Sequence, residues 1–230
     1  MARQERALRT RQAVLEAAAE VFADRGYEAA TITEILDRAG VTKGALYFHF
    51  PSKEDLARDV LEHAVTEPPP EQLIKLQSFV DTGLILAHRL PREPLLRGAA
   101  RIAADQSAQR FFGLPWPVWV EHTAAVLAAA KEQGEVLPHV DPVLTAQTMV
   151  GAFTGTQLFS EAADGMADLE RRTALLYELI LPGIAAPGVL GRLDTSPERG
   201  ARLVEESGRE AEETAETAGI AEIDGAAETV

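Results

Sequence analysis

The sequence predicts an all-α protein with two helical domains. Apolar residues recur at helical spacing along almost the whole chain, and no stretch alternates apolar and polar residues between turn signals. The composition, 46% hydrophobic and 25% charged over 230 residues, is that of a folded protein with one large or two modest cores. We expect an N-terminal domain over 1–67, a larger helical domain over 71–193 and an acidic, disordered tail over 194–230.

The first predicted helix, from about Leu8 to Asp24, carries its apolar residues on one stripe. Gly26 is typical of the position just after a helix. The second helix begins at a capping box, Thr31-Ile-Thr-Glu34, in which each of the two end side chains bonds the backbone N–H of the other residue. This helix should end at Ala39-Gly40, since glycine tolerates the positive φ of a tight turn.

Two more short helices should follow closely. Thr42 can cap a third helix from Lys43 to about His49, and Ser52 can cap a fourth. The fourth helix should end near Glu67, because Pro68-Pro69-Pro70 cannot continue it. In the second domain, helical patterns occupy roughly 71–90, 94–110, 116–133, 142–163 and 167–185.

Charge is distributed unevenly along the chain. The formal net charge is −14, but residues 194–230 hold 11 acidic and 3 basic residues. Residues 1–53 hold 8 basic and 7 acidic residues, so a nucleic-acid partner is compatible with the acidic total. The absence of Cys and the five scattered His predict no disulfide, no metal site and no cofactor. We find no signal peptide and no run of about 18 apolar residues, so we expect a cytoplasmic protein.

Two short helices joined by a tight glycine turn, with another helix packed behind them, are typical of a helix-turn-helix, whose second helix lies in the DNA major groove. The segment Lys43-Gly-Ala-Leu-Tyr-Phe-His-Phe50 suits that second helix. Lys43 can donate to guanine O6 or N7, and Tyr47 can donate to a phosphate. Gly44 and Ala45 are small enough to let the backbone approach base edges.

The other side chains around this helix should divide between core and surface. Leu46 and Phe50 should point into the three-helix core, while His49 and Lys53 should lie on the outer side, near the next phosphates. Capped helices around a glycine turn also occur in helical proteins that never bind DNA. The pattern alone therefore leaves DNA binding and simple packing equally open.

The segment TITEILDRAGVTKGALYFHFPSKEDLA resembles the signature of the TetR family of repressors, and the resemblance extends through RTRQAVLEAAAEVFADRGYEAA. It implies a homodimer of two-domain helical chains that binds double-stranded operator DNA and senses a small molecule in the larger domain. The DNA contacts that it implies fall on Thr33, Thr42, Lys43, Gly44, Tyr47, His49 and Lys53. Recognition helices about 34–36 Å apart would read a near-palindromic operator.

Further segments resemble the γ-butyrolactone receptors, which are autoregulator-sensing repressors of antibiotic and secondary-metabolite genes. These segments are MARQERA, VTKGALYFHF, PWPVWVE, GTQLFSEA and ILPGIAAPGVL. The resemblance places a pocket tryptophan at Trp119 and a pocket hydroxyl at Thr156, with Thr154 as its possible substitute. Aromatic residues such as Phe153 suit an apolar cavity for an amphiphilic ligand, although any one such ring is more often a core residue.

One departure from that group leaves the effector open. Near the end of the fourth helix, where the group has Gln, the chain reads His63-Ala64-Val65. A butenolide, a furan, a pathway end product or a range of multidrug ligands therefore remains as an alternative to a γ-butyrolactone. In the family the dimer forms through the last two long helices, where the candidate seam residues are Val143, Val150, Leu176 and Leu179.

Two other classes of protein compete with this interpretation. An enzyme is disfavoured, because the chain has no G-x-S-x-G, H-E-x-x-H, G-x-G-x-x-G or P-loop motif. A helical ligand carrier that does not bind DNA is the second competitor. A test of DNA binding separates this carrier from a repressor: in a repressor, the segment from Lys43 to Lys53 binds duplex DNA with a steep dependence on salt.

Overall fold

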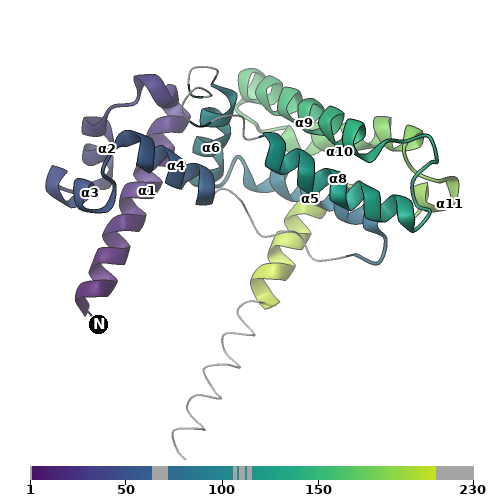
Figure 1. Ribbon diagram of the computed structural model, residues 1–230, viewed down its shortest axis with the longest axis horizontal. Helices are drawn as coiled ribbons and strands as arrows, with labels where there is room; N and C mark the ends of the chain where they lie inside the picture. The colour runs from purple at the N-terminus through teal and green to yellow at the C-terminus, as the bar shows by residue number, and fades with distance from the viewer. Residues whose placement is uncertain (1, 64–71, 106–107, 109–111, 113–115, 211–230) are drawn as a thin grey trace, which may run out of the picture. The chain divides into compact units, whose positions relative to one another are not determined.

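The computed structural model describes residues 2–63, 72–105, 108, 112 and 116–210, and over these residues it confirms the all-α prediction (Figure 1). The described part of the chain contains no strand beyond an isolated bridge between Val136 and Ala185. The contacts divide the chain into two compact units. The first unit comprises residues up to 67 together with 89–123, and the second comprises 68–88 together with 124 onward.

The first unit is built on α1 (Ala2–Ala29), with the shorter helices grouped around it (Figure 1). These are α2 (Ile32–Ala39), α3 (Lys43–His49), α4 (Lys53–His63) and α6 (Pro94–Ala104). Its core is apolar and includes the fully buried side chains of Leu15, Phe22, Ile35, Leu46 and Leu56. Burial of each such side chain stabilises the fold by about 1.5–3 kcal/mol. The starts of α2 and α3 agree with the sequence prediction.

Helix α1 begins at Ala2, earlier than the predicted start near Leu8. Its first turns are supported by an ion pair between Arg9 and Glu5, one helical turn apart. Gly26 lies near the other end with φ 76° and ψ 170°, outside the helical region. The regular helix is therefore interrupted at the glycine that the sequence marks as its stop.

Helix α6 belongs to the first unit because its backbone lies very close to α1. A Cβ on Gly98 would be 2.5 Å from the carbonyl oxygen of Ala19, so a larger residue would not fit there. The sequence places 94–110 in the second domain, because periodicity shows that a helix has an apolar face but not which element covers it. The predicted boundary between 67 and 71 lies outside the described residues.

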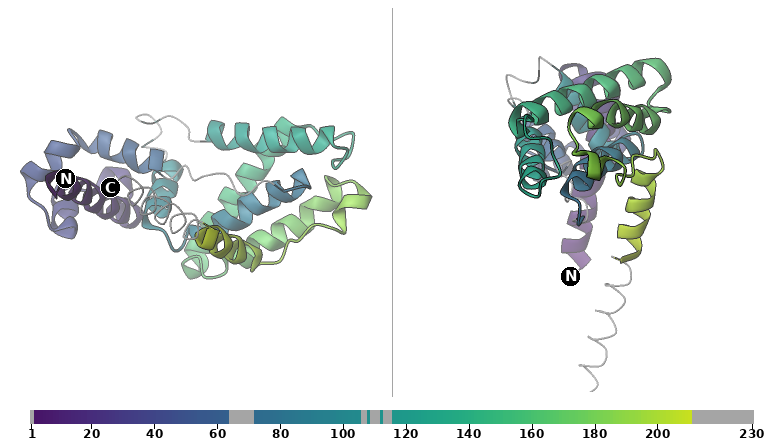
Figure 2. Two further views of the ribbon diagram at one scale, coloured as in Figure 1. Left: turned by 90° about the horizontal axis from the view of Figure 1, so that it is seen from below. Right: turned by 90° about the vertical axis from the view of Figure 1, so that its right-hand side faces the viewer.

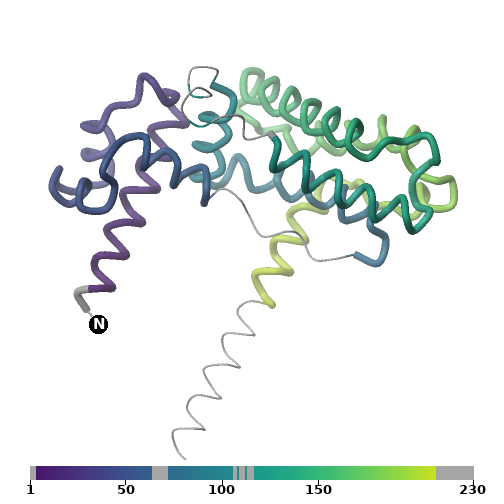
Figure 3. The backbone as a smooth tube through the Cα atoms, in the orientation of Figure 1, coloured from purple at the N-terminus to yellow at the C-terminus, as the bar shows by residue number. Residues whose placement is uncertain are grey.

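The second unit is a helical bundle. Its main helices are α5 (Lys75–Arg89), the C-terminal half of α8 (Trp116–Glu132), α9 (Pro142–Asp164) and α10 (Leu169–Ile180). Figures 2 and 3 show α9 and α10 running side by side, and the two helices are in contact. A short turn, η1 (Leu181–Gly183), and α11 (Pro187–Leu190) follow. Among the described helices, none has the length and apolar character needed to cross a membrane.

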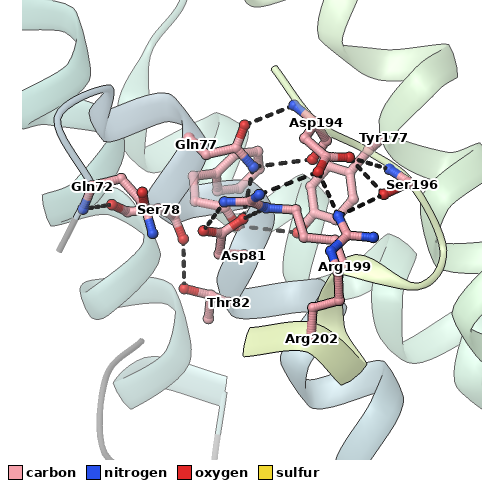
Figure 4. Close-up of polar contacts among 11 residues, drawn as sticks. Gln72, Gln77, Ser78, Asp81, Thr82, Tyr177, Asp194, Ser196, Arg199 and Arg202 are labelled. Carbon is pink, nitrogen blue, oxygen red and sulfur yellow. Dashed lines mark hydrogen bonds and ion pairs between the residues drawn. The ribbon is translucent and has the colours of Figure 1, made fainter. Parts of the chain in front are cut away.

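The prediction of a disordered tail from residue 194 is wrong for its first part. Residues 199–210 are helical, and the start of this helix packs on α5 (Figure 4). Arg199 donates to both carboxylate oxygens of Asp81, which is fully buried in α5. Gly200 lies so close to the carbonyl group of Leu84 that a Cβ would collide with it. Residues 211–230 lie outside the described residues.

A glutamine joins this contact to the chain before the helix. The Gln77 amide donates to Asp81 at 2.6 Å and to the Asp194 carbonyl at 3.0 Å, and it accepts from the Asp194 N–H at 2.8 Å. Burial acts to raise the pKa of Asp194, but hydrogen bonds from Ser196 and Arg199 hold it below its usual value. We call Gln77, Asp81, Asp194, Arg199 and Gly200 the C-terminal clasp. These buried and part-buried polar contacts, together with the buried side chain of Leu203, hold the C-terminal helix on the second unit.

Candidate DNA-binding site

The turn between α2 and α3 is built as the sequence predicts. Thr31 Oγ1 accepts from the Glu34 N–H at 3.2 Å, and the Glu34 carboxylate accepts from the Thr31 N–H at 3.1 Å. The hydrogen bonds from Thr31 hold the pKa of Glu34 below its usual range. Gly40 adopts φ 64°, and its N–H donates to the Leu36 carbonyl at 3.0 Å. Helix α2 therefore ends in a left-handed turn that leads directly to Thr42.

Helix α3 is fixed to the first unit along one side. Thr42 caps it, since its hydroxyl accepts from the Ala45 N–H at 3.3 Å. Leu46 is fully buried and Phe50 is 3% exposed, which confirms that these two side chains face the core. A helix of 7 residues does not persist alone, so tertiary packing of Leu46 and Phe50 holds α3 in place.

The opposite side of α3 faces solvent. Lys43 and Gly44 are exposed, and Tyr47 is 41% exposed. The Lys43 ammonium lies 5.8 Å from the centroid of the Tyr47 ring. Phe48 is also on the surface, with 78% of its area exposed. Phe48 was not among the predicted DNA contacts, although its position two residues from both Leu46 and Phe50 places it on the opposite side of the helix.

Four other predicted DNA contacts lie around this surface. Thr33 on α2 and Thr42 before α3 are exposed, whereas Ala45 and His49 are half-buried. The His49 ring packs edge-on against Phe48, with 5.0 Å between ring centroids. Contact of these four residues with DNA stays a prediction.

Lys53 does not lie on the outer side, where the sequence placed it. Its ammonium donates to the carbonyl groups of Glu28 and Ala30 at 3.1 and 2.6 Å, and it lies 4.7 Å from the centroid of the Tyr27 ring. Burial lowers the pKa of Lys53. Carbonyl groups at a helix C-terminus lack intrahelical donors, and a lysine can supply them. Lys53 therefore serves the end of α1, and its geometry gives no support to a phosphate contact.

Arg11, one of the N-terminal arginines, is likewise used inside the unit. It donates to both carboxylate oxygens of Asp59 at 2.7 Å, and its guanidinium lies 5.2 Å from the centroid of the Phe50 ring. Arg6 and Arg9 remain exposed on α1. The positive charge near the N-terminus is thus partly structural and partly available to an anionic partner.

The predicted ligand-binding residues fall in both units. Trp119 is half-buried on the part of α8 that belongs to the first unit, whereas Phe153, Thr154 and Thr156 are half-buried on α9 in the second unit. Each threonine hydroxyl donates to the carbonyl group four residues earlier, at 2.8 and 2.9 Å respectively. Each hydroxyl oxygen still has lone pairs with which to accept a hydrogen bond. That these residues line one pocket stays a prediction.

An apolar surface lies on α9 and α10. Of the predicted seam residues, Val143 and Leu179 are exposed, and Val150 and Leu176 are half-buried. The exposed large apolar side chains of these two helices are Val143, Leu144, Leu158, Phe159, Leu175 and Leu179. Monomers rarely expose large contiguous apolar patches, so a group of six exposed large apolar side chains on two neighbouring helices is typical of an interface between subunits.

Two family models match the chain on either side of the α4–α5 connection. The model described as "Bacterial regulatory proteins, tetR family" matches residues 14–60, which reach from α1 into α4. The model described as "Tetracyclin repressor-like, C-terminal domain" matches residues 74–186. The second match ends before Asp194, Arg199 and Gly200 of the C-terminal clasp.

Relatives of nearly full length agree with these matches. The A-factor receptor protein of Streptomyces griseus is 42% identical over 224 residues, which are 96% of this chain and 79% of the receptor. The crystal structure of TylP, a TetR regulator from Streptomyces fradiae, has a TM-score of 0.78 at 43% identity and covers 87% of this chain and 98% of its own. A crystal structure of a γ-butyrolactone receptor (ArpA-like protein) has a TM-score of 0.69 at 31% identity, with coverage of 87% and 99%.

A further solved structure is that of CprB from Streptomyces coelicolor in complex with its biological operator sequence. It has a TM-score of 0.68 at 30% identity and covers 84% of this chain and 97% of its own. These relatives are transcriptional regulators and not enzymes. The capped α2–α3 pair, with one side in the core and the other in solvent, has the geometry of a helix-turn-helix. The chain therefore belongs to the TetR family and is a DNA-binding repressor of that type.

Proposed function

We propose that the chain is a homodimeric repressor that reads a near-palindromic operator and is released by a small lactone-like autoregulator, so that it controls secondary-metabolite genes. The observation that carries this proposal is the outer face of α3, which presents Lys43, Gly44 and Tyr47 to solvent from a helix anchored by Leu46 and Phe50. The similarity to the A-factor receptor and to a γ-butyrolactone receptor supports the class of effector.

The exposed residues of α3 make different kinds of contact with DNA in this proposal. Lys43 donates to guanine O6 or N7 in the major groove, and the Tyr47 hydroxyl donates to a phosphate. A Cβ on Gly44 would meet nothing within 4 Å, so the surface there is open and the backbone can approach a base edge. Thr33, Thr42, Ala45 and His49 surround these contacts and add to them.

The apolar surface of α9 and α10 is the interface that we propose for the homodimer. Leu144, Phe159 and Leu179 are each more than 60% exposed in the single chain, so pairing with a second copy would remove large apolar groups from water. A two-fold axis through this interface relates two copies of α3. At a spacing of about 34–36 Å, the two copies read half-sites one DNA turn apart.

Release of DNA is a shift between two conformers of the dimer. The effector must bind more tightly to the conformer in which the α3 helices have lost their one-turn spacing, because a ligand with equal affinity for both conformers shifts nothing. We assign the transmission of this shift to α4, which connects the helix-turn-helix to the ligand-binding domain. Trp119 and Thr156 are the ligand contacts that we propose, by stacking and by hydrogen bonding.

A different effector within the same mechanism is favoured by one sequence observation. Lactone receptors typically have a polar Gln near the end of α4, where this chain reads His63-Ala64-Val65 and has no Gln. Ala64 and Val65 lie outside the described residues. Loss of that polar contact supports a butenolide, a furan, a pathway end product or a multidrug ligand as the alternative to a γ-butyrolactone.

A gel shift of the purified chain on its own upstream DNA, with and without γ-butyrolactones and butenolides, tests the function. Binding that a single compound releases at low concentration is the expected result. If the chain binds the DNA and none of these compounds releases it, the DNA-binding function stands and the proposed class of effector is rejected.

Substitution of the proposed pocket tryptophan tests the ligand site separately. Trp119→Ala should leave operator affinity unchanged and abolish release by the active compound. Equal loss of operator binding and release in this variant would contradict the assignment of Trp119 to the ligand site.

A further inference from the structure

Phe48 is exposed on α3 without a structural reason. The side chain is 78% exposed, almost twice the value of its neighbour Tyr47. The core contacts of α3 come from Leu46 and Phe50, so Phe48 is not needed to hold the helix in place. Its ring packs edge-on against His49, which is itself half-buried. A large apolar ring therefore stands in water, directly beside the residues proposed to contact DNA.

The position of Phe48 on the helix places it on the DNA-facing side. Residues four apart lie one above the other along a helix, so Phe48 follows Gly44 just as Tyr47 follows Lys43. No atom lies within 4 Å of a Cβ built on Gly44, so the surface next to Phe48 is open. Lys43, Gly44, Tyr47 and Phe48 form one continuous face.

The chemistry of a phenyl ring limits what it can recognise. It has no donor or acceptor, so it can neither bond the polar edge of a base nor neutralise a phosphate. The apolar group that a base pair presents in the major groove is the C5 methyl of thymine. We propose that Phe48 packs against the methyl group of a thymine in each half-site and is a specificity-determining residue of this repressor.

This assignment rests on the proposed function, since it requires α3 to enter the major groove. The neighbours of Phe48 favour a nucleic-acid partner over an apolar protein surface. Lys43 carries a positive charge and Tyr47 a hydroxyl, and both suit phosphates and base edges. An apolar protein partner would leave these two polar groups without partners on burial.

The test pairs Phe48 with a single methyl group of DNA. The full chain is used to select binding duplexes from a random library, and each thymine of the selected site is replaced in turn by deoxyuridine, which lacks only the C5 methyl. The wild-type chain should lose about fourfold in affinity at one thymine of each half-site, the effect expected for one buried methyl group. Phe48→Ala should bind the thymine and deoxyuridine duplexes equally.

Tyr47→Phe is the matched control for this experiment. It removes a phosphate donor, so it should weaken binding to both duplexes and keep the fourfold ratio between them. If Phe48→Ala binds too weakly to measure, Phe48→Gln takes its place. The expected ratio of its affinities for the thymine and deoxyuridine duplexes is one. The melting temperature of each variant should equal that of the wild type, because Phe48 and Tyr47 are exposed.

The outcomes separate this assignment from the proposed function. If a specific duplex is selected but its affinity is the same with thymine and deoxyuridine, or if Phe48→Ala keeps the ratio, the Phe48 assignment is overturned and the repressor function stands. Phe48 would instead act as a wedge between bases if the chain preferred duplexes with flexible base steps whether or not the thymine methyl is present. That result also overturns the assignment. If no duplex is selected, the proposed DNA-binding function itself fails.

Discussion

The outer face of α3 and the C-terminal clasp use their polar side chains in opposite ways. In the clasp, Asp81 is fully buried and accepts hydrogen bonds from Arg199 and Gln77. On α3, Lys43 and Tyr47 point into solvent. A buried charged group whose hydrogen bonds are satisfied inside the protein has a structural role, whereas one exposed beside an open backbone is available to a ligand. By this criterion Lys53, which bonds the end of α1, belongs with the structural groups.

The largest effect should follow from breaking the buried ion pair. Arg199→Met leaves the Asp81 carboxylate buried without its cation, and we expect a loss of about 3–5 kcal/mol in the free energy of unfolding, measured by urea denaturation. Arg202→Met is the control, because Arg202 is 49% exposed and should contribute about 0–1 kcal/mol. The double variant Asp81→Leu/Arg199→Met should recover most of the loss. If Arg199→Met costs no more than the roughly 0–1 kcal/mol expected of Arg202→Met, the buried pair with Asp81 does not contribute to holding the helix on α5.

The next effect concerns the close approach of the clasp to α5. Gly200→Ala places a methyl group against the backbone of Leu84 and should destabilise the chain by about 1–3 kcal/mol in the same denaturation experiment. Gly208→Ala is the matched control on the same helix, where a Cβ meets nothing within 4 Å. It should stabilise the chain slightly, by up to about 1 kcal/mol, through higher helix propensity. Two variants with the same sign would argue against docking of the helix on α5.

The two lysines that flank α3 should separate DNA binding from stability. Lys43→Ala should weaken operator binding by about 1–3 kcal/mol and leave the unfolding midpoint unchanged. Lys53→Met should lower the free energy of unfolding by about 1–2 kcal/mol, because it removes the hydrogen bonds that the ammonium donates to the exposed Glu28 carbonyl and the part-buried Ala30 carbonyl. Binding titrations and thermal melts of both variants check this. A larger loss of operator affinity in Lys53→Met than in Lys43→Ala would reverse the roles assigned here.

The smallest effect is expected at the capping box of α2. Thr31→Ala removes the acceptor for the Glu34 N–H and should cost about 1 kcal/mol in stability. It should also raise the pKa of Glu34 toward its ordinary value, since the hydrogen bond from the Thr31 hydroxyl is the largest of the causes that lower it. An NMR titration of the Glu34 carboxyl measures this shift. Thr33→Ala, two residues away on the exposed side of α2, should leave that pKa unchanged.

Local signals in the sequence were sufficient for the helix-turn-helix. The capping box at Thr31, the turn at Gly40 and the inward side chains of Leu46 and Phe50 are all present in the structure. They could be predicted because each depends on residues within one or two helical turns. Contact of Thr42, Lys43, Gly44 and Tyr47 with DNA was also predicted from these local signals, but it stays a prediction. Phe48 was not among the predicted contacts, although its spacing from the inward Leu46 and Phe50 already places it on the outer side of α3.

By itself, the sequence determined the all-α class, the order of the helices, the cap residues and the membership of the TetR family, because spacing, caps and family motifs are properties of neighbouring residues. Only the tertiary structure decided that α6 joins the first unit, that Lys53 bonds the end of α1, and that Arg199 docks on Asp81 across 118 positions of the chain. Each of these contacts joins residues that are distant in sequence. Their formation depends on how helix faces fit together, which periodicity does not encode.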